Sequence, residues 1–202
     1  TMEESLLKGI RSLEIGVNHL YHSKFDEMTT EEILEYIEEG TDDRIYAIAE
    51  LLRRDTDHEE IFRRTKIDRL FIRVFQHIVD MEAEVKAKPM DPQVLFEAKK
   101  MGFSDMIIGK MWGMTAHQVF DVRKEHKIFP TYKMIDSCAS EFESYIPYFY
   151  STYEQENESI ISDKKKVIVL GSGPIRIGQG VEFDYSTVHA VKTIKESGYE
   201  AI

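Results

Sequence analysis

Residues 65–85, TKIDRLFIRVFQHIVDMEAEV, decide the fold of this chain. Apolar side chains recur here every three or four residues, so they would share one face of a helix. Thr65 with Asp68 predicts where this helix begins, and Pro89 predicts where it ends. We expect it to be the longest helix and the centre of the hydrophobic core. Its predicted core-facing residues are Ile67, Leu70, Phe71, Val74, Phe75, Ile78, Met81 and Val85.

The rest of the first 150 residues is typical of a series of shorter helices with recognisable ends. The pairs Thr29 with Glu32 and Thr56 with Glu59 have the spacing of a capping box, which satisfies backbone N–H groups at a helix start. Gly40 predicts a left-handed helix end. Further helices are expected at residues 41–52, from Pro92 to a glycine exit at Gly102, at 104–111 and at 115–126.

Residues 131–153 are rich in tyrosine and lack a clean period, so they predict an irregular connection packed on the helical body. A dense aromatic run in this segment favours an interface, which we expect to be with other domains of a larger protein rather than with a second copy. The polar residues 154–166 are typical of an exposed linker. The run comprises Tyr145, Ile146, Tyr148, Phe149 and Tyr150.

The final 39 residues begin an α/β unit with a strand at 166–170, a glycine-rich turn, a helix at 186–195 and a strand at 199–202. Such a unit needs its strands paired within one sheet before its apolar faces are covered. We therefore expect that it is not self-sufficient and that the chain is a piece of a larger protein. The predicted fold class is mainly α: an all-α domain at residues 1–160, followed by the truncated start of an α/β domain at 161–202.

Composition and charge exclude several classes of function. The chain has 202 residues and a formal net charge of −11, which repels nucleic-acid phosphates and anionic membranes. No apolar run approaches the roughly 20 residues that span a bilayer. A single cysteine, Cys138, excludes an internal disulfide, so a reducing compartment and a cytoplasmic location are expected. We expect Cys138 to pack rather than to act as a nucleophile.

The glycine-rich turn is a weak candidate for a phosphate site. Its glycines at 171, 173, 178 and 180 give the spacing GxGxxxxG, which is neither the dinucleotide motif nor a Walker loop. A tight strand-to-helix turn explains them better, and we expect no cofactor-binding residues. His19 and His22 are close enough to share a helical face, but no third ligand is evident, so no metal site is expected.

A nucleic-acid-binding alternative comes from residues 102–128, GFSDMIIGKMWGMTAHQVFDVRKEHKI, which have the pattern of a helix-turn-helix. The acidic residue Asp121 on the second helix and the net charge argue against it. The competing interpretation is a helical hairpin whose Ile107, Ile108, Met111, Val119 and Val122 join the core. In the alternative, the second helix would present His117, Gln118, Arg123 and Lys124 to a DNA major groove.

Several motifs together resemble one family. The segment GSGPIRIGQGVEFDYS at 171–186 resembles the opening of each synthetase half of the carbamoyl phosphate synthetase large chain. LLKGIRSLEIG at 6–16 is similar to the helix that closes the first half. Segments 42–54, 65–82, 101–113 and 132–154 resemble successive signatures of its connecting, or oligomerisation, domain. This chain departs from the family at Ser137, Ser140 and Leu70, where threonine, alanine and, nearby, tryptophan are usual.

The resemblance implies a structural linker and oligomerisation domain, followed by the start of a pre-ATP-grasp, Rossmann-like domain. The parent would be an ATP-dependent ligase that makes carbamoyl phosphate from bicarbonate, glutamine-derived ammonia and ATP for arginine and pyrimidine synthesis. It would use magnesium or manganese with potassium, bind a small glutamine amidotransferase subunit, and form homo-oligomers. No catalytic residue is expected in this chain. By resemblance, the residues lining an internal carbamate passage would be Arg176, Gln179, Gly180 and Glu182.

Overall fold

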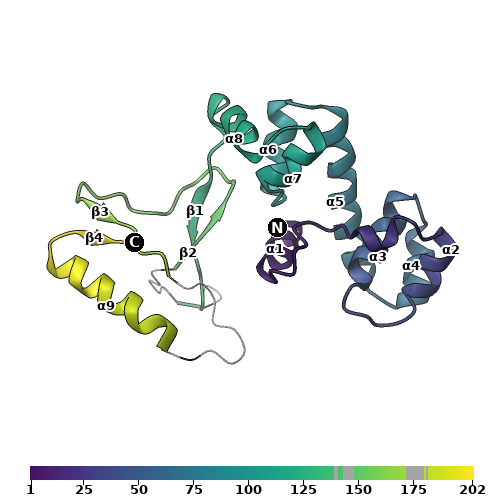
Figure 1. Cartoon of the computed structure of the whole chain (residues 1–202), viewed down its shortest axis with the longest axis horizontal. Coiled ribbons are helices and arrows are strands. Elements are labelled where there is room, and N and C mark those ends of the chain that lie inside the picture. The colour runs from purple at the N-terminus through teal and green to yellow at the C-terminus, as the bar shows by residue number, and fades with distance from the viewer. Residues whose placement is uncertain (139–140, 143–147, 172–179, 181) are drawn as a thin grey trace. The chain divides into compact units, whose positions relative to one another are not determined.

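A computed structural model of the chain describes residues 1–138, 141–142, 148–171, 180 and 182–202. Its internal contacts divide it into two compact units, Thr1–Glu158 and Ser159–Ile202 (Figure 1). The domain boundary expected between residues 160 and 161 stays a prediction, because a division by contacts does not test where a functional domain ends.

The first unit is helical and is organised around its longest helix, α5, of 19 residues. Helix α5 packs against α1, α3, α4, α6 and α7, while α7 and α8 form a helical hairpin (Figure 1). The predicted all-α fold of this part is confirmed, apart from a small hairpin described below. The elements are α1 (Met2–Ser12), η1 (Ser23–Phe25), α2 (Thr30–Tyr36), α3 (Arg44–Arg53), α4 (His58–Thr65), α5 (Arg69–Ala87), α6 (Pro92–Lys100), α7 (Asp105–Trp112) and α8 (Ala116–Glu125).

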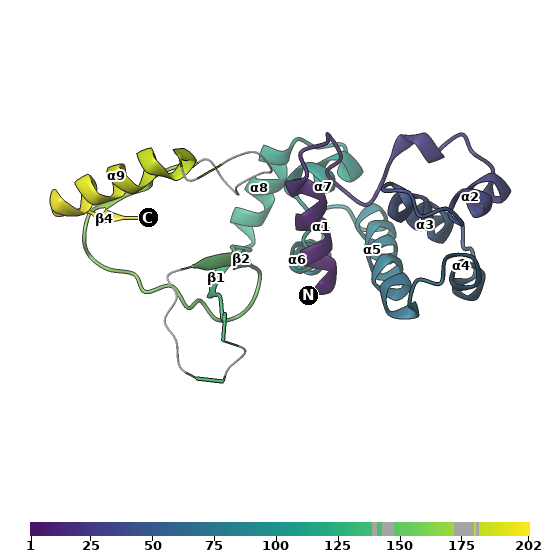
Figure 2. The same cartoon turned by 90° about the horizontal axis from the view of Figure 1, so that it is seen from below.

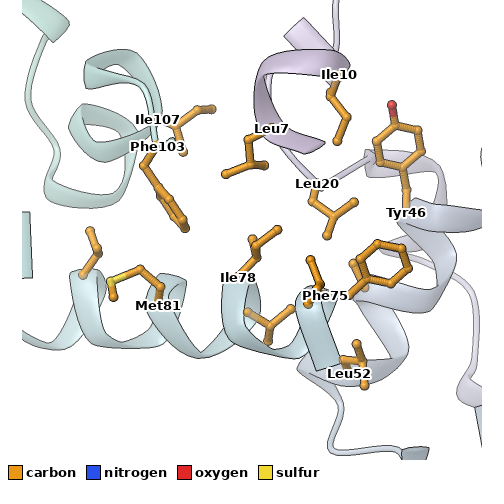
Figure 3. Close-up of a cluster of buried hydrophobic side chains, with 14 of the residues drawn as sticks. Leu7, Ile10, Leu20, Tyr46, Leu52, Phe75, Ile78, Met81, Phe103 and Ile107 are labelled. Carbon is orange, nitrogen blue, oxygen red and sulfur yellow. The ribbon is translucent and has the colours of Figure 1, made fainter. Parts of the chain in front are cut away.

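The hydrophobic core lies where α1, α3, α5 and α7 meet. Figure 3 shows Ile78 and Met81 of α5 facing Leu7 of α1, with Phe103 entering from the segment before α7. Burial of such side chains contributes about 25 cal/mol for each Å² removed from water. Trp112, at the end of α7, donates its indole N–H to the carbonyl oxygen of Val85 at 2.7 Å, which ties α7 to the end of α5.

The apolar stripe of α5 is buried over most of its length but not at its beginning. Val74, Phe75, Ile78, Met81 and Val85 are buried, as predicted. The prediction that Leu70 and Phe71 also face the core is wrong, since these side chains are 46% and 47% exposed. Ile72 in the same turn is fully buried, so the covering elements reach one side of this end of α5 and leave Leu70 and Phe71 uncovered.

Two predicted helix starts are wrong by a few residues. Asp57, rather than Thr56, caps α4 by accepting the N–H of Glu59. Asp68 caps α5, whereas Thr65 is the last residue of α4. In the first case, Asp57 lies beside the expected Thr56 and its carboxylate accepts the orphan N–H of Glu59. In the second case, Thr65 is still bound within α4, where its hydroxyl donates to the carbonyl of Ile61, and Asp68, three residues later, caps α5.

Other helix ends agree in part with the sequence pattern. The capping box of Thr29 and Glu32 is present. Gly102 has φ +89° at the end of α6, as predicted for a helix exit. Gly40 is not left-handed, because α2 already ends at Tyr36 and its cap, Ile37, stays right-handed. The helix expected at 41–52 begins only at Arg44.

Residues 131–152 contain an antiparallel hairpin where an irregular connection was expected. β1 (Thr131–Met134) pairs with β2 (Phe149–Thr152), with Tyr132 opposite Ser151. Thr152 is buried and donates its hydroxyl to Glu4 Oε2 of α1 at 3.1 Å, and Lys8 donates to the carbonyl of Ser151. This hairpin is therefore fastened to α1.

The second unit is a small βαβ arrangement. β3 (Lys166–Val167) pairs in parallel with β4 (Glu200–Ala201), and α9 (Glu182–Glu196) packs against β4 (Figure 2). The predicted parallel pairing is confirmed, but β3 is shorter than the expected strand at 166–170. Within the described residues of this unit, no side chain is buried, and Ile168 and Leu170 are 68% and 91% exposed.

Candidate self-association surface and buried polar clusters

A buried ionic cluster joins α3, α5 and the connection that follows α1. Glu82 of α5 is 3% exposed and accepts two hydrogen bonds from Arg53 of α3, at 2.6 and 2.8 Å. His19 Nε2 lies 2.8 Å from the same carboxylate, and Arg53 also donates to the carbonyl of Leu20 at 2.6 Å. Both carboxylate oxygens of Glu82 are therefore hydrogen-bonded, as a buried carboxylate requires.

The pKa of Glu82 reflects this environment. Burial alone would raise the pKa, because it disfavours the charged form. Hydrogen bonds and charge from Arg53 and His19 outweigh burial and lower the pKa to about 2. The group is therefore a permanent carboxylate that positions three elements, and it is not a candidate general acid or base.

A second polar cluster joins α6, α7 and α8. Asp105 accepts from Lys99 at 2.9 Å and from Arg123 at 2.6 Å. Lys99 also donates to the carbonyl of Phe103 at 2.7 Å, and Arg123 to that of Ile128 at 3.1 Å. Burial lowers the pKa of Lys99, an effect that the Asp105 carboxylate opposes. Sequence reasoning missed this cluster.

The same cluster argues against DNA binding by α8. Arg123, one of the four expected DNA contacts, is 7% exposed and committed to Asp105. Gln118 closes the capping box of α8 with Thr115. Ile107, Ile108, Val119 and Val122 are buried, so the interpretation of α7 and α8 as a core-forming helical hairpin is confirmed.

One exposed apolar surface lies where α4 meets α5. We call it the α4–α5 patch and define it as the exposed Leu70 and Phe71 together with Phe62 and Ile67, which are partly buried and pack against the core cluster. Arg69 borders the patch: its guanidinium lies 3.7 Å from the centre of the Phe62 ring and forms two hydrogen bonds with Glu59, at 2.6 and 2.7 Å. Its rim is therefore ordered and polar around an apolar centre, as at protein interfaces.

The charge around the α4–α5 patch differs from that of the whole chain. Residues 58–73 contain five Lys or Arg and three Asp or Glu, whereas the chain as a whole carries −11. Two copies of an acidic protein repel one another. This repulsion is weaker where the local charge is slightly positive and both signs are present, so a second copy can approach here more easily than at an acidic face.

A second exposed apolar surface lies on the hairpin. Tyr132 and Phe149 point to the same side of β1 and β2 and are 46% and 38% exposed. Tyr148 and Tyr150 are also exposed. Of the predicted aromatic run, Tyr145 and Ile146 lie outside the described residues. The expectation that this run packs on other domains stays a prediction.

The residues predicted to line a carbamate passage are only partly described. Arg176 and Gln179 lie outside the described residues. Gly180 lies in the loop immediately before α9, and Glu182 is the first residue of that helix. The passage role of all four stays a prediction.

His19 and His22, weighed above as possible metal ligands, form hydrogen bonds. His19 and His22 turn to different partners, Glu82 and the N–H of Lys24. In the described ranges, no group of three or more His, Cys, Asp or Glu residues could hold a metal ion. Cys138 is half-buried, and the packing role expected for it stays a prediction. No helix in the described part is long and apolar enough to cross a bilayer.

Comparison with known families identifies the family to which the chain belongs. Residues 1–127 match the family described as carbamoyl-phosphate synthetase large chain, oligomerisation domain. Residues 163–202 match the carbamoyl phosphate synthase preATP-grasp domain. The first match covers more than half of the 202 residues, and the two occur in the order that the sequence motifs predicted. The chain therefore belongs to the carbamoyl-phosphate synthetase large-chain family and carries its oligomerisation domain.

Proposed function

We propose that the α4–α5 patch is the surface through which this oligomerisation domain associates with a second copy. The observation that carries the proposal is the exposure of two large apolar side chains in the first turn of α5, Leu70 and Phe71, next to Ile72, which is buried. Adjacent exposed apolar side chains on a helix form an unpartnered apolar face, and such faces mark interaction sites.

The extent of the family match narrows the choice of surface. The α4–α5 patch lies inside residues 1–127, whereas the exposed hairpin residues Tyr132 and Phe149 lie outside them. Leu13 and Ile15 are also inside the match and exposed, but they belong to a connection rather than a helix. Met106 of α7 and Phe120 of α8 lie on helices but are less exposed than Leu70 and Phe71. Rigid elements hold an interface more accurately than connections do. The patch at the start of α5 is thus the better-supported surface.

For the whole large chain, we propose the ATP-dependent ligase activity of its family. It would make carbamoyl phosphate from bicarbonate, glutamine-derived ammonia and ATP, for arginine and pyrimidine synthesis in the cytoplasm. ATP with magnesium or manganese, potassium and a small glutamine amidotransferase subunit belong to this proposal. Both family matches support it. We assign residues 1–158 a connecting and assembling role in that enzyme, without catalytic residues.

Light scattering over a dilution series from about one to several hundred micromolar tests the surface. We expect a reversible dimer or tetramer for the unaltered chain. Phe71→Lys should weaken association at least tenfold, because it places a charge in a desolvated contact. Phe149→Lys is the matched control, since Phe149 is similarly exposed but lies on the hairpin.

Each result has a definite meaning. Loss of association in Phe71→Lys alone, with an unchanged melting temperature, supports the α4–α5 patch. Loss of association in Phe149→Lys alone would assign the self-association surface to the hairpin instead. A monomer at every concentration for the unaltered chain would contradict self-association through these residues.

A further inference from the structure

The connection between α1 and η1 forms, together with α7, a pocket of about 340 Å³ in the first unit. Its walls are residues 15–19 and 21–23 of the connection and Ile107 and Lys110 of α7. This volume is at the lower end of small-molecule sites, which range from about 300 to 1,000 Å³. None of its lining residues belongs to the α4–α5 patch or to the predicted passage residues.

The electrostatic character of the pocket is opposite to that of the chain. None of the residues lining it is an aspartate or glutamate, although the chain contains 37 of them. His19, His22 and Lys110 line it. In the described part of the chain Lys110 forms no ion pair, whereas Lys8, Lys24, Lys88, Lys99 and Lys133 each pair with a carboxylate. An unpaired ammonium beside a pocket free of acids attracts an anion.

The pocket also presents hydrogen-bond donors. The N–H of Lys24 donates to His22 Nδ1 at 3.1 Å, so a neutral His22 carries its proton on Nε2 and can donate with it. Within the described ranges, the backbone N–H groups of Gly16, Val17 and Asn18 have no hydrogen-bond partner. Successive free N–H groups near a cation are a common way to bind an oxyanion.

The pocket wall is held in place by the core. The ring of His19 is fixed by Glu82, which Arg53 holds from α3. Ile107, which also lines the pocket, is 7% exposed and belongs to the core cluster. A site with walls fixed before binding loses less conformational entropy when a ligand enters.

We propose that this pocket binds a small molecule through an oxyanion group, either a phosphate or a carboxylate, with Lys110 as the charged contact and His22 as a donor. Binding would brace the connection after α1 against α7. Because a ligand that binds only the folded state stabilises it, occupancy would raise the melting temperature of the first unit.

The test uses the full chain and two probes, inorganic phosphate and acetate, each titrated at constant ionic strength. Amide chemical shifts of Gly16, Val17 and Asn18 report binding by NMR. We expect saturable shifts with a Kd in the millimolar range, as for a single group in a small pocket. Lys110→Met should weaken binding at least tenfold, whereas Lys124→Met, which removes an exposed lysine of α8, should leave it unchanged.

Lys110→Arg keeps the positive charge, so its Kd for the probe should be within about threefold of that of the unaltered chain. This variant still tests the proposal if Lys110→Met unfolds. Saturation by phosphate alone identifies a phosphoryl group, and saturation by acetate alone identifies a carboxylate. Absence of saturable shifts up to about 50 mM of either probe would overturn the proposal. Equal weakening by Lys110→Met and Lys124→Met would overturn it too, because it would show general charge screening.

Discussion

The two units of the chain differ most in what their apolar side chains do. In Thr1–Glu158, residues such as Leu7, Phe103 and Ile78 are almost completely buried around α5. In Ser159–Ile202, Ile168, Leu170 and Val188 are at least 62% exposed. Both units have regular secondary structure, so the difference lies in packing alone.

Local structure and stability therefore come from different sources in this chain. The second unit has its strand, helix and parallel strand in the order that a βαβ pattern predicts, yet β3 and β4 pair over only two residues each. Helices and strand pairs without a buried face are marginal in water. The first unit is stabilised by the burial of its apolar side chains. The second unit would need additional surfaces to cover its apolar side chains before it gained the same stabilisation.

The largest expected contrast is in amide hydrogen exchange of the intact chain. Amides of Phe75 and Ile78 should exchange on the order of a thousandfold or more slower than that of Val169, because core helices open only on global unfolding. Val169 does donate to the carbonyl of Ile202, at 2.8 Å, but this pair is at an exposed end. Slow exchange of Val169, comparable to that of α5, would contradict the comparison.

A change at Glu82 should have the next largest effect. Glu82→Ala leaves Arg53 without its carboxylate, and removing one partner of a buried pair costs about 3–5 kcal/mol of unfolding free energy. Urea denaturation followed by circular dichroism measures this loss. The matched control, Glu196→Ala, breaks the exposed pair with Lys192 in α9, which should cost no more than about 0.5 kcal/mol.

The pH dependence of stability checks the same residue independently. The pKa of Glu82 is about 2 in the folded chain, below its ordinary value of 4.5. Its contribution is therefore present above pH 4.5 and is lost as the pH falls toward 2, a loss of about 3 kcal/mol. In Glu82→Gln this component should be absent, and an unchanged acid profile would show that Glu82 is not responsible.

A smaller effect is expected for Gly109 in α7. A Cβ atom placed there would lie 2.5 Å from the carbonyl oxygen of Met114, which is backbone and cannot easily move. Gly109→Ala should therefore destabilise the first unit by roughly 2 kcal/mol, although alanine usually favours a helix. The control Gly198→Ala, at φ +84°, should strain only the second unit and leave the melting temperature of the first unchanged.

Periodicity in the sequence predicted the helical fold and most of the α5 core face. It did not predict that Leu70 and Phe71 are exposed, because a period shows which side chains share a face and not how far the covering elements extend. The hairpin was not predicted, because β1 and β2 are separated by 14 residues whose sequence has no clear hydrophobic period.

The two buried polar clusters could not be predicted from the sequence either. Glu82 interrupts an apolar stripe, which is a signal that a buried acid needs a partner. Its partner Arg53 is 29 residues away on another helix, so only the packing of α3 on α5 brings the two together. The pocket at Lys110 has the same origin, since the connection after α1 and the helix α7 meet only in the folded chain.

The hydrogen bond from Trp112 to Val85 gives the molecule an internal reporter. Trp112 is the only tryptophan of the 202 residues, and it is partly buried in the first unit. Its fluorescence is therefore sensitive to separation of α7 from α5, with no other indole to obscure the signal. Thermal or denaturant unfolding of the oligomerisation domain can be followed by selectively excited tryptophan emission, without a label, because residues 159–202 contain tyrosine but no tryptophan.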